Sequence, residues 1–371
     1  MLSRSIVVQS LRSIRARFFD TRRQRNEQSD GQGPANDVTG PSLDNLPVDM
    51  QFLIMTFLSP QDLCRLGGTS TYWRSMVRDP VLWKYFLLRD MPLWRSVDHL
   101  SVPQVKLNGS AVLDDSEMQL DYMAEYLRVC PACRNQWRHQ PGVFESVTSF
   151  FQSLVLVSEP QFAMFGPGLE QLEIPLMNTI MRSPHVLPVA GLPQRQIDGI
   201  GSGISFKYKD QHRFNIATLY STNRSERERA RLERLNLRSK LFVYEEDSES
   251  NIPLNINPMF NQVCQAVNGF IFVANAETER GGTDQGWEDE SAQIRVMLDP
   301  AVGAVSRPIL VFSCVSRETA DGRRTPCMTV AHRLHLNSLP NPWMVQDTAA
   351  ETLTGLLDGI DWLLRHSGVK L

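Results

Sequence analysis

The sequence lacks a long hydrophobic run. In 371 residues, no stretch approaches the roughly 20 apolar residues that a membrane-spanning helix needs. The sequence also lacks a strong excess of charge of either sign. It has 38 Lys and Arg and 41 Asp and Glu, which gives a formal net charge of −3. This balance argues against a dedicated nucleic-acid binder, so we expect a chain that binds neither nucleic acid nor membrane.

Cysteine is scarce as well. The six cysteines are spread along the chain, and only Cys130 and Cys133 form a C-x-x-C pair. A structural zinc site needs four ligands, yet the nearest further candidate is His139 and no second pair follows. We interpret the pair as two chance thiols in a reducing compartment, and the sequence predicts no metal and no cofactor.

The length is typical of two or three domains. Residues 1–25 are rich in Arg and Ser and carry apolar residues at helical intervals, and residues 28–41 are almost free of apolar side chains. We interpret residues 1–41 as a disordered, basic N-terminal arm and linker. A mitochondrial presequence or a basic amphipathic arm has a similar composition, so both alternatives stay open.

Residues 43–86 contain three groups of apolar residues at helical spacing, which we call bursts. They lie at 50–57, 63–73 and 82–86. Each burst has a start signal: Pro47, then Ser59-Pro60, then Asp79-Pro80. The bursts predict three short helices. Their many large apolar residues cannot all be buried among themselves, so some should face another protein.

This stretch resembles an F-box. The resemblance rests on seven groups of residues in order: Leu46-Pro47, Asp49, the Ile54/Leu58 ridge, Asp62-Leu63, Trp73, Asp79-Pro80 and Leu82-Trp83. It implies an all-α F-box over residues 42–90 that docks onto the Skp adaptor of a cullin–RING ubiquitin ligase. An ordinary helical hairpin is the alternative. The adaptor-binding residues expected from the resemblance are Leu46, Pro47, Leu53, Ile54, Leu58, Leu63, Leu66, Trp73, Leu82 and Trp83.

The next segment, residues 91–158, reads as a helical linker. An acidic start at Asp114 predicts a helix through Leu127 that ends by Pro131, and a second helix is expected from Gly142 through Leu154. We find no catalytic constellation in this segment.

Residues 159–371 predict an α/β domain. Residues 269–274 and 308–314 are unbroken apolar runs typical of strands buried on both faces, and further strands are expected at 162–165 and 343–346. Residues 204–208 and 214–220 read as an antiparallel hairpin. Helical patterns at 169–181, 259–267, 284–298 and 349–365 alternate with these strands, which predicts a mostly parallel sheet with helices on both faces.

This order of elements resembles that of a small GTPase, and residues 343–363 resemble the last strand, loop and helix of the ADP-ribosylation-factor branch. The nucleotide chemistry is degenerate, however. Counted from Gly166, the last three positions of a phosphate loop hold Gln171, Leu172 and Glu173 instead of Gly, Lys and Ser or Thr. The guanine-reading motif expected after residue 312 is also missing. We therefore predict a degenerate nucleotide site at Gly166, Gly168, Ser316 and Thr348 that does not hydrolyse GTP.

Residues 325–336 lie where small GTPases carry a polar helix. Met328, Val330 and Ala331 instead form an apolar, β-prone run. We expect part of this run to be exposed and to supply a docking edge for a substrate, with simple packing onto the sheet as the alternative.

Together these features resemble the F-box proteins that carry an atypical small-GTPase-like C-terminal domain. The resemblance implies a non-catalytic substrate-recognition subunit of a Skp–cullin–F-box ligase that directs bound proteins to ubiquitination and proteasomal degradation. It also implies telomeric repeat-binding factor and phosphorylated D-type cyclin as substrates, a small heat-shock protein as helper, and a homodimer. The expected location is cytoplasmic, with the nucleus as a further site. The alternative function is an unconventional guanine-nucleotide switch.

Overall fold

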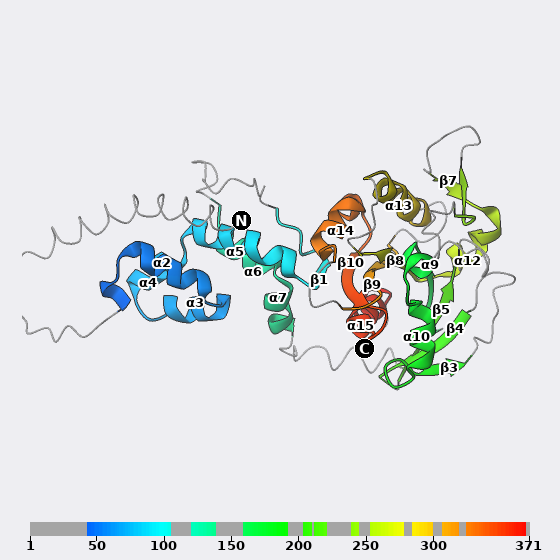
Figure 1. Cartoon of the computed structure of the whole chain (residues 1–371), viewed down its shortest axis with the longest axis horizontal. Helices are drawn as coiled ribbons and strands as arrows, with labels where there is room; N and C mark the ends of the chain where they lie inside the picture. Colours follow the sequence, from blue (N-terminus) through cyan, green and yellow to red (C-terminus); the bar gives the residue numbers. More distant parts are fainter. Residues whose placement is uncertain are drawn as a thin grey trace, which may run out of the picture. The chain divides into compact units, whose positions relative to one another are not determined.

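The computed structural model describes residues 43–104, 120–138, 159–191, 203–209, 211–220, 239–244, 253–277, 284–299, 306–318 and 324–368. The chain divides into two compact units. The helical unit comprises the described residues up to Leu93 together with Pro103–Trp137, and the sheet unit comprises Trp94–Val102 and the described residues from Arg138 onward. Figure 1 shows both units with their helices and strands labelled.

The helical unit contains short helices that begin at recognisable caps. Ser59 accepts a hydrogen bond from the backbone of Asp62 at the start of α3, and Asp79 caps α5 through the backbone N–H of Val81. Ser70 caps a further helix, α4. The helices are α2 (Val48–Phe57), α3 (Pro60–Gly67), α4 (Thr71–Val77), α5 (Pro80–Asp90), α6 (Tyr122–Val129) and α7 (Pro131–Arg138), with short 3-10 turns η1 (Leu43–Asn45) and η2 (Met91–Leu93).

The sequence patterns predicted the two proline starts correctly but not the number of helices. The second burst forms two helices, because α3 ends at Gly67 and Ser70 caps the start of α4. Pro47 occupies the N-cap position of α2 and not its first turn.

The predicted helical linker, residues 91–158, does not form a unit of its own. Helix α6 begins at the cap Asp121 and not near Asp114, and its Tyr126 packs against Trp83 of α5 with ring centroids 5.3 Å apart. Helix α7, which begins at Pro131, was not predicted. The helix expected from Gly142 lies outside the described residues.

The sheet unit is built on one eight-stranded sheet of order β1-β10-β9-β8-β2-β5-β4-β3. The central strands β10, β9, β8, β2 and β5 are parallel, whereas β4 pairs with β5 as the predicted antiparallel hairpin. The strands are β1 (Ser96–Asp98), β2 (Gln161–Phe165), β3 (Val189–Gly191), β4 (Gly203–Tyr208), β5 (His212–Thr218), β8 (Gly269–Asn275), β9 (Ile309–Val315) and β10 (Trp343–Ala349); β6 (Phe242–Tyr244) and β7 (Pro253–Ile256) form a separate pair.

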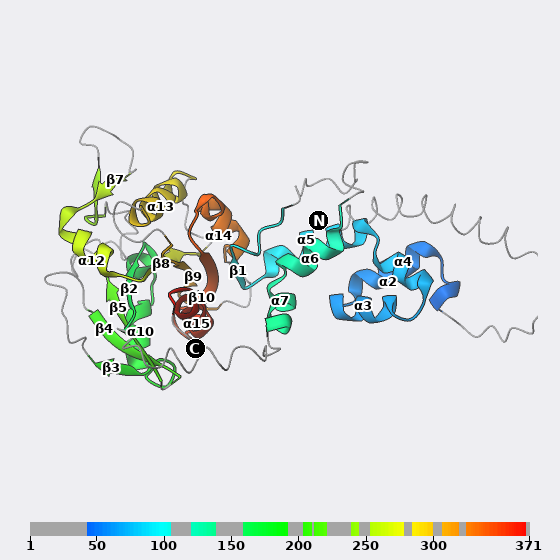
Figure 2. The same ribbon diagram turned by 180° about the vertical axis from the view of Figure 1, so that it is seen from behind.

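Helices cover both faces of this sheet, as the alternation of patterns predicted (Figures 1 and 2). One face packs against α12, α13 and α14, and the other packs against α9, α10 and α15. Every residue of β8 and β9 is buried, which agrees with their unbroken apolar runs. The helices are α9 (Gly168–Gln171), α10 (Leu176–Arg182), α12 (Asn261–Ala266), α13 (Asp284–Met297), α14 (Cys327–Arg333) and α15 (Leu356–His366), with 3-10 turns η4 (Pro258–Phe260) and η6 (Leu336–Ser338).

The segment directly after α5 and η2 supplies an edge strand to the sheet. Strand β1 pairs antiparallel with β10, and the backbone N–H of Asp347 donates to Arg95 O at 2.8 Å. The thiol of Cys327 donates to Asp347 Oδ1 at 2.9 Å and lies 3.3 Å from Arg95 O, while Arg324 pairs with the same carboxylate at 2.9 Å. These contacts fix residues 94–102 to the sheet unit, which the helical-linker prediction missed.

Two further predictions need correction. The helical pattern over 169–181 forms two short helices, because Pro175 cannot continue α9 and instead sits at the cap of α10. The run 327–333 forms helix α14 and not a β-prone edge. The N-terminal arm and linker predicted over residues 1–41 lie outside the described residues. Among the helices that the structure describes, none combines the length and apolar character needed to cross a membrane.

Gly355 should be indispensable to the sheet unit. Its φ is +77°, and a Cβ placed there would lie 2.1 Å from the carbonyl oxygen of Asp347. We expect Gly355→Ala to lower the free energy of unfolding by about 2–5 kcal/mol, measured by thermal or urea unfolding. Gly286 of α13 meets nothing within 4 Å, so Gly286→Ala should leave stability unchanged or raise it by up to about 1 kcal/mol. Equal effects of the two variants would contradict this view.

Asp361 should make stability depend on acid. Burial alone would raise its pKa, but hydrogen bonds from Tyr208 (2.6 Å) and Lys209 (3.1 Å) and the charge of Arg365 (2.7 Å) hold the pKa of Asp361 below its usual value. The ionised carboxylate therefore stabilises the fold above about pH 4, and this contribution is lost as the pH falls through the folded-state pKa. Chemical unfolding at a series of acidic pH values should give a shallower decline for Asp361→Asn than for the parent chain; parallel curves would disprove the role of this carboxylate.

Candidate functional site

Helix α2 is apolar on two opposite faces. Its inward face buries Val48, Gln51, Phe52 and Met55, which recur at helical spacing. Residues two positions further along, at 50, 53, 54 and 57, repeat the same spacing on the other face with apolar side chains. Apolar side chains that are left open on the second face of a helix are typical of a protein-binding surface.

The segment before α2 is held in place by side chains of α2 and α4. The amide of Gln51 donates to Leu43 O at 3.0 Å and to Asp44 O at 3.2 Å, and it accepts a hydrogen bond from Tyr72. The indole of Trp73 donates to Asp44 Oδ1 at 2.6 Å. These bonds fix the chain that leads into Leu46 and Pro47, so these two residues are presented beside the outward face of α2.

The structure separates the ten predicted adaptor-binding residues into two groups. Pro47 is exposed, and Leu46, Leu53, Ile54, Leu58 and Leu66 are half-buried, so their role stays a prediction. The expectation of direct contact is wrong for four others, because they are part of the core of the helical unit and at most 4% exposed. These four are Leu63, Trp73, Leu82 and Trp83.

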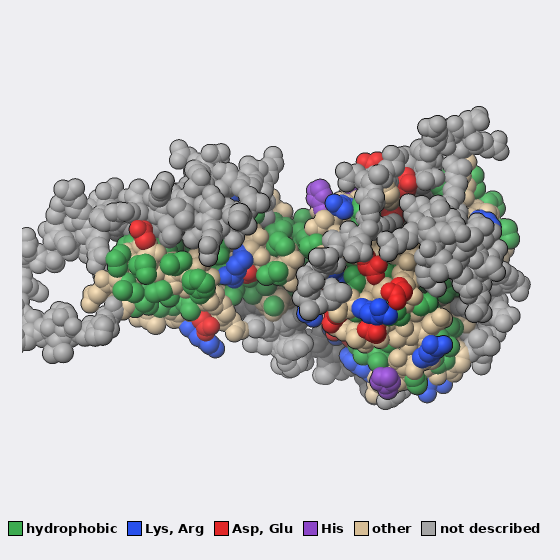
Figure 3. Space-filling view, viewed as in Figure 1, with side chains coloured by type: hydrophobic (Ala, Val, Ile, Leu, Met, Phe, Trp, Pro, Cys, Tyr) green, Lys and Arg blue, Asp and Glu red, His purple; other side chains and the backbone are tan. Residues whose placement is uncertain are grey.

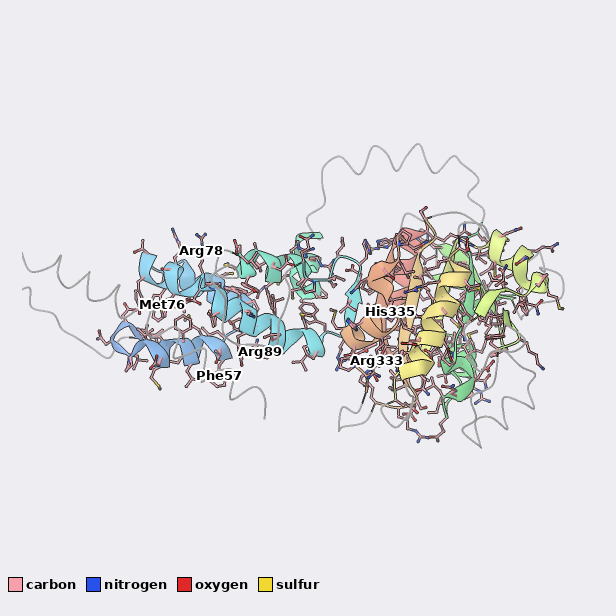
Figure 4. All side chains as sticks on the ribbon, turned by 90° about the horizontal axis from the view of Figure 1, so that it is seen from above. Phe57, Met76, Arg78, Arg89, Arg333 and His335 are labelled. Carbon is pink, nitrogen blue, oxygen red and sulfur yellow. The ribbon has the colours of Figure 1, made fainter. Side chains whose placement is uncertain are left out.

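The sequence analysis missed the most exposed apolar residue of this surface. Phe57 is 81% exposed at the last position of α2, and Met50 (47%) and Leu43 (36%) are also open to solvent. Figure 3 shows hydrophobic side chains gathered over the part of the helical unit that carries α2 to α4, and Figure 4 labels Phe57. The sequence did indicate this position, because Phe57 follows Met50 by seven residues and therefore lies on the same face of the helix. We call Leu43, Leu46, Pro47, Met50, Leu53, Ile54 and Phe57 the outer α2 face.

In the sheet unit, the predicted degenerate nucleotide site lies at the carboxyl ends of the parallel strands, where open α/β sheets bind ligands. Gly166 follows β2 with φ +118°, and a Cβ on Gly168 would lie 2.7 Å from the Val273 side chain. Both glycines therefore allow the loop to pack closely against β8. This close packing accounts for the two glycines, so phosphate binding is not needed to explain them.

The loop after β2 is closed against the loops after β9 and β10. The hydroxyl of Ser316 accepts a hydrogen bond from the backbone N–H of Glu173 at 3.1 Å. Arg317 pairs with Glu173 at 3.1 Å and with Glu351 at 3.5 Å. Gln171 accepts a hydrogen bond from Asn275 at 3.3 Å. These side chains bind one another across the edge at which a nucleotide would enter.

The structure brings three of the four predicted nucleotide-site residues to this edge. Thr348 is different, since it lies within β10, is 1% exposed and hydrogen-bonds Gln346 O at 3.4 Å. Strand β9 also continues to Val315, so Ser313 lies inside the sheet and not in a loop. Leu172 stands where a phosphate-loop lysine would stand and is fully buried.

The proposed docking edge at residues 328–331 is wrong. Val330 and Ala331 are at most 1% exposed and pack against the sheet, and Met328 is half-buried. The apolar residues of this run are the inward stripe of α14, so charges placed there would disrupt the core and not a binding surface.

Metal-binding clusters are not apparent in the described part of the chain, where no three His, Cys, Asp or Glu gather. All six cysteines are free thiols.

A protein-family model and several named relatives are similar to this chain. An F-box-like family model matches residues 43–89. F-box only protein 4 from Bos taurus is 49% identical over 333 residues, which span 89% of this chain and 85% of the relative. The Homo sapiens protein of the same name is 48% identical over 333 residues with the same coverage, and the Mus musculus protein is 48% identical over 328 residues, 88% of this chain and 84% of the relative.

Among solved structures, the Arl6 BBS3 small GTPase of Trypanosoma brucei with the bound nucleotide analogue GppNp is similar to the chain. The match covers 57% of this chain and 98% of that one, with 12% identity and a TM-score of 0.33. Our description of the architecture rests on the strand order of the sheet and not on this match.

Proposed function

The chain belongs to the F-box only protein 4 family, and we propose that it is a substrate-recognition subunit of a Skp–cullin–F-box ubiquitin ligase. The observation that carries the proposal is the outer α2 face. Apolar side chains there, led by Phe57 at 81% exposed, are not covered by the residues of the helical unit that the structure describes. Exposed apolar patches of this kind are typical of protein-binding sites.

The function is one of proximity. The helical unit binds the Skp adaptor, and the sheet unit binds the protein to be ubiquitinated. Holding a substrate lysine near the charged ubiquitin-conjugating enzyme raises its effective concentration, which alone increases transfer rates by orders of magnitude. The chain itself needs no catalytic residue in this scheme.

We propose further that the GTPase-like sheet has lost its nucleotide chemistry. Glu173 brings negative charge to the edge where phosphates would bind, and its own backbone N–H donates to Ser316. Helix α9 is only four residues long, so it offers little of the helix dipole that stabilises phosphate in active relatives of this fold. These features support a protein-binding domain over the alternative guanine-nucleotide switch.

Family resemblance supports finer proposals about partners. Telomeric repeat-binding factor and phosphorylated D-type cyclin are the proposed substrates, a small heat-shock protein is the proposed helper, and the receptor is proposed to self-associate. Because a ligase subunit must meet its cullin complex, we propose a cytoplasmic location that extends to the nucleus.

Phe57→Asp should abolish capture of the adaptor. Burying a Phe side chain contributes about 2–3 kcal/mol, and a carboxylate in its place adds a desolvation cost, so affinity should fall at least about 30-fold. The measurement is titration of recombinant Skp adaptor against the full chain. Phe57 is so exposed that the melting temperature should not change.

A matched control is Met259→Asp, since Met259 is 68% exposed but lies in the sheet unit. This variant should bind the adaptor like the parent chain. The assignment of the outer α2 face is wrong if Phe57→Asp binds normally, or if both variants lose binding alike.

Titration with a fluorescent guanine nucleotide and Mg²⁺ separates the receptor from the switch. We expect no saturable binding up to about 100 μM, because the carboxylate of Glu173 disfavours a triphosphate at close range. A dissociation constant of about 1 μM or lower would establish the nucleotide switch and refute the loss of nucleotide chemistry, while leaving the adaptor-binding proposal to its own test.

A further inference from the structure

Two thiols meet at the junction of α6 and α7. Cys130 caps the end of α6 and directly precedes Pro131, the first residue of the eight-residue helix α7. Cys133 follows three positions later, one turn into α7, so the two side chains lie on the same side of the helix start. Two thiols separated by two residues at the start of a helix form the C-x-x-C arrangement in which redox-active pairs occur.

The surroundings of the two thiols differ in a way that makes one of them a nucleophile. A hydrogen bond from the Cys133 side chain is the main cause that lowers the pKa of Cys130; burial opposes it, and the backbone N–H groups of Cys133 and Ala132 lower the pKa further. The same hydrogen bond to Cys130, together with burial, raises the pKa of Cys133. The two directions make Cys130 the thiol that loses its proton more readily, as in redox-active C-x-x-C pairs at helix starts.

The remaining cysteines lack this arrangement. Burial raises the pKa of Cys264 to about 11 and that of Cys314 to about 12, and it raises the pKa of Cys64 as well. Cys327 donates to the carboxylate of Asp347, and its pKa is raised by burial and by that charge. All six cysteines lie in the described ranges, and only Cys130 has a lowered pKa.

We propose that Cys130 and Cys133 are a redox modification site that closes to an intramolecular disulfide on exposure to hydrogen peroxide. In the first step, Cys130 Sγ attacks one peroxide oxygen, the O–O bond breaks, and Cys130 becomes a sulfenic acid as hydroxide leaves and takes up a proton. In the second, Cys133 Sγ attacks the sulfenic sulfur and water leaves. Overall, two thiols lose two electrons and two protons, and peroxide is reduced to two water molecules. A dithiol reductant reverses the disulfide by exchange.

The small exposure of the two thiols to solvent favours a small oxidant over a large one. Cys130 is only 4% exposed, whereas Cys133 is half-buried. A molecule of the size of hydrogen peroxide reaches the Cys130 sulfur more readily than a bulky disulfide such as oxidised glutathione does. The site is independent of the proposed ligase function, because it rests only on the α6–α7 junction.

The test is differential alkylation of the full chain. The chain is exposed to stoichiometric hydrogen peroxide, denatured in N-ethylmaleimide and cleaved with trypsin after Arg128 and Arg134, which places both thiols in the single peptide 129–134. We expect this peptide to lose both alkylation sites and to become two hydrogen atoms lighter, roughly tenfold faster than Cys264 is oxidised. Reduction with dithiothreitol before alkylation should restore both adducts.

Variants assign the two roles. Cys133→Ser should stop the reaction at a sulfenic acid on Cys130 that reacts with dimedone, and Cys130→Ser should slow oxidation of residue 133 roughly tenfold or more. Cys64→Ser is the matched control, since Cys64 is an exposed thiol of the same unit, and it should leave disulfide formation unchanged. A peptide 129–134 that keeps both adducts in the parent chain, or a disulfide that joins Cys64 or a second chain instead, would overturn the proposal.

Discussion

The proposed function depends on α2, a helix that the described residues of its own unit bury on only one side. The inward face of α2 packs Phe52 and Met55 into the helical unit, and the opposite face carries Phe57 at 81% exposed. Leaving such a face in water costs roughly 25 cal/mol for each Å² of apolar surface. Within the unit, Gln51 and Trp73 hold the segment before α2 in place, so the outer α2 face is formed in advance of binding and loses little entropy when a partner covers it.

The sheet unit shows the opposite balance, since its potential ligand edge is already closed by its own side chains. Ser316 and Arg317 both engage Glu173, one through its backbone and the other through its carboxylate. The proposed loss of nucleotide chemistry would leave the strand order and the flanking helices in place, which would illustrate that a fold does not fix a function. Residues 94–102 add β1 to this sheet, so the chain enters the sheet unit before it returns to α6 and α7.

Much of the fold could be predicted from local patterns. The apolar runs of β8 and β9, the β4–β5 hairpin and the proline starts of α3 and α5 each follow from spacing or capping chemistry. Features that depend on contacts between distant parts of the sequence could not be predicted. The short strand β1 depends on pairing with β10, more than 240 residues away, and α14 was misjudged because a β-branched run that covers a sheet resembles a strand. Arg307, buried beneath the ring of Phe270 and bonded to Cys264 O, has no sequence signal at all.

In the candidate site, the spacing of apolar residues placed Leu53 and Ile54 on the outer α2 face, but it did not show that Trp73 of α4 and Trp83 of α5 are buried, and it overlooked Phe57. The central claim is that an apolar face of α2 is covered by the Skp adaptor. The most direct measurement is calorimetric titration of the full chain with that adaptor at several temperatures. Burial of the outer α2 face predicts tight binding with a clearly negative change in heat capacity. Absence of binding, or binding with a heat-capacity change near zero, would contradict the account.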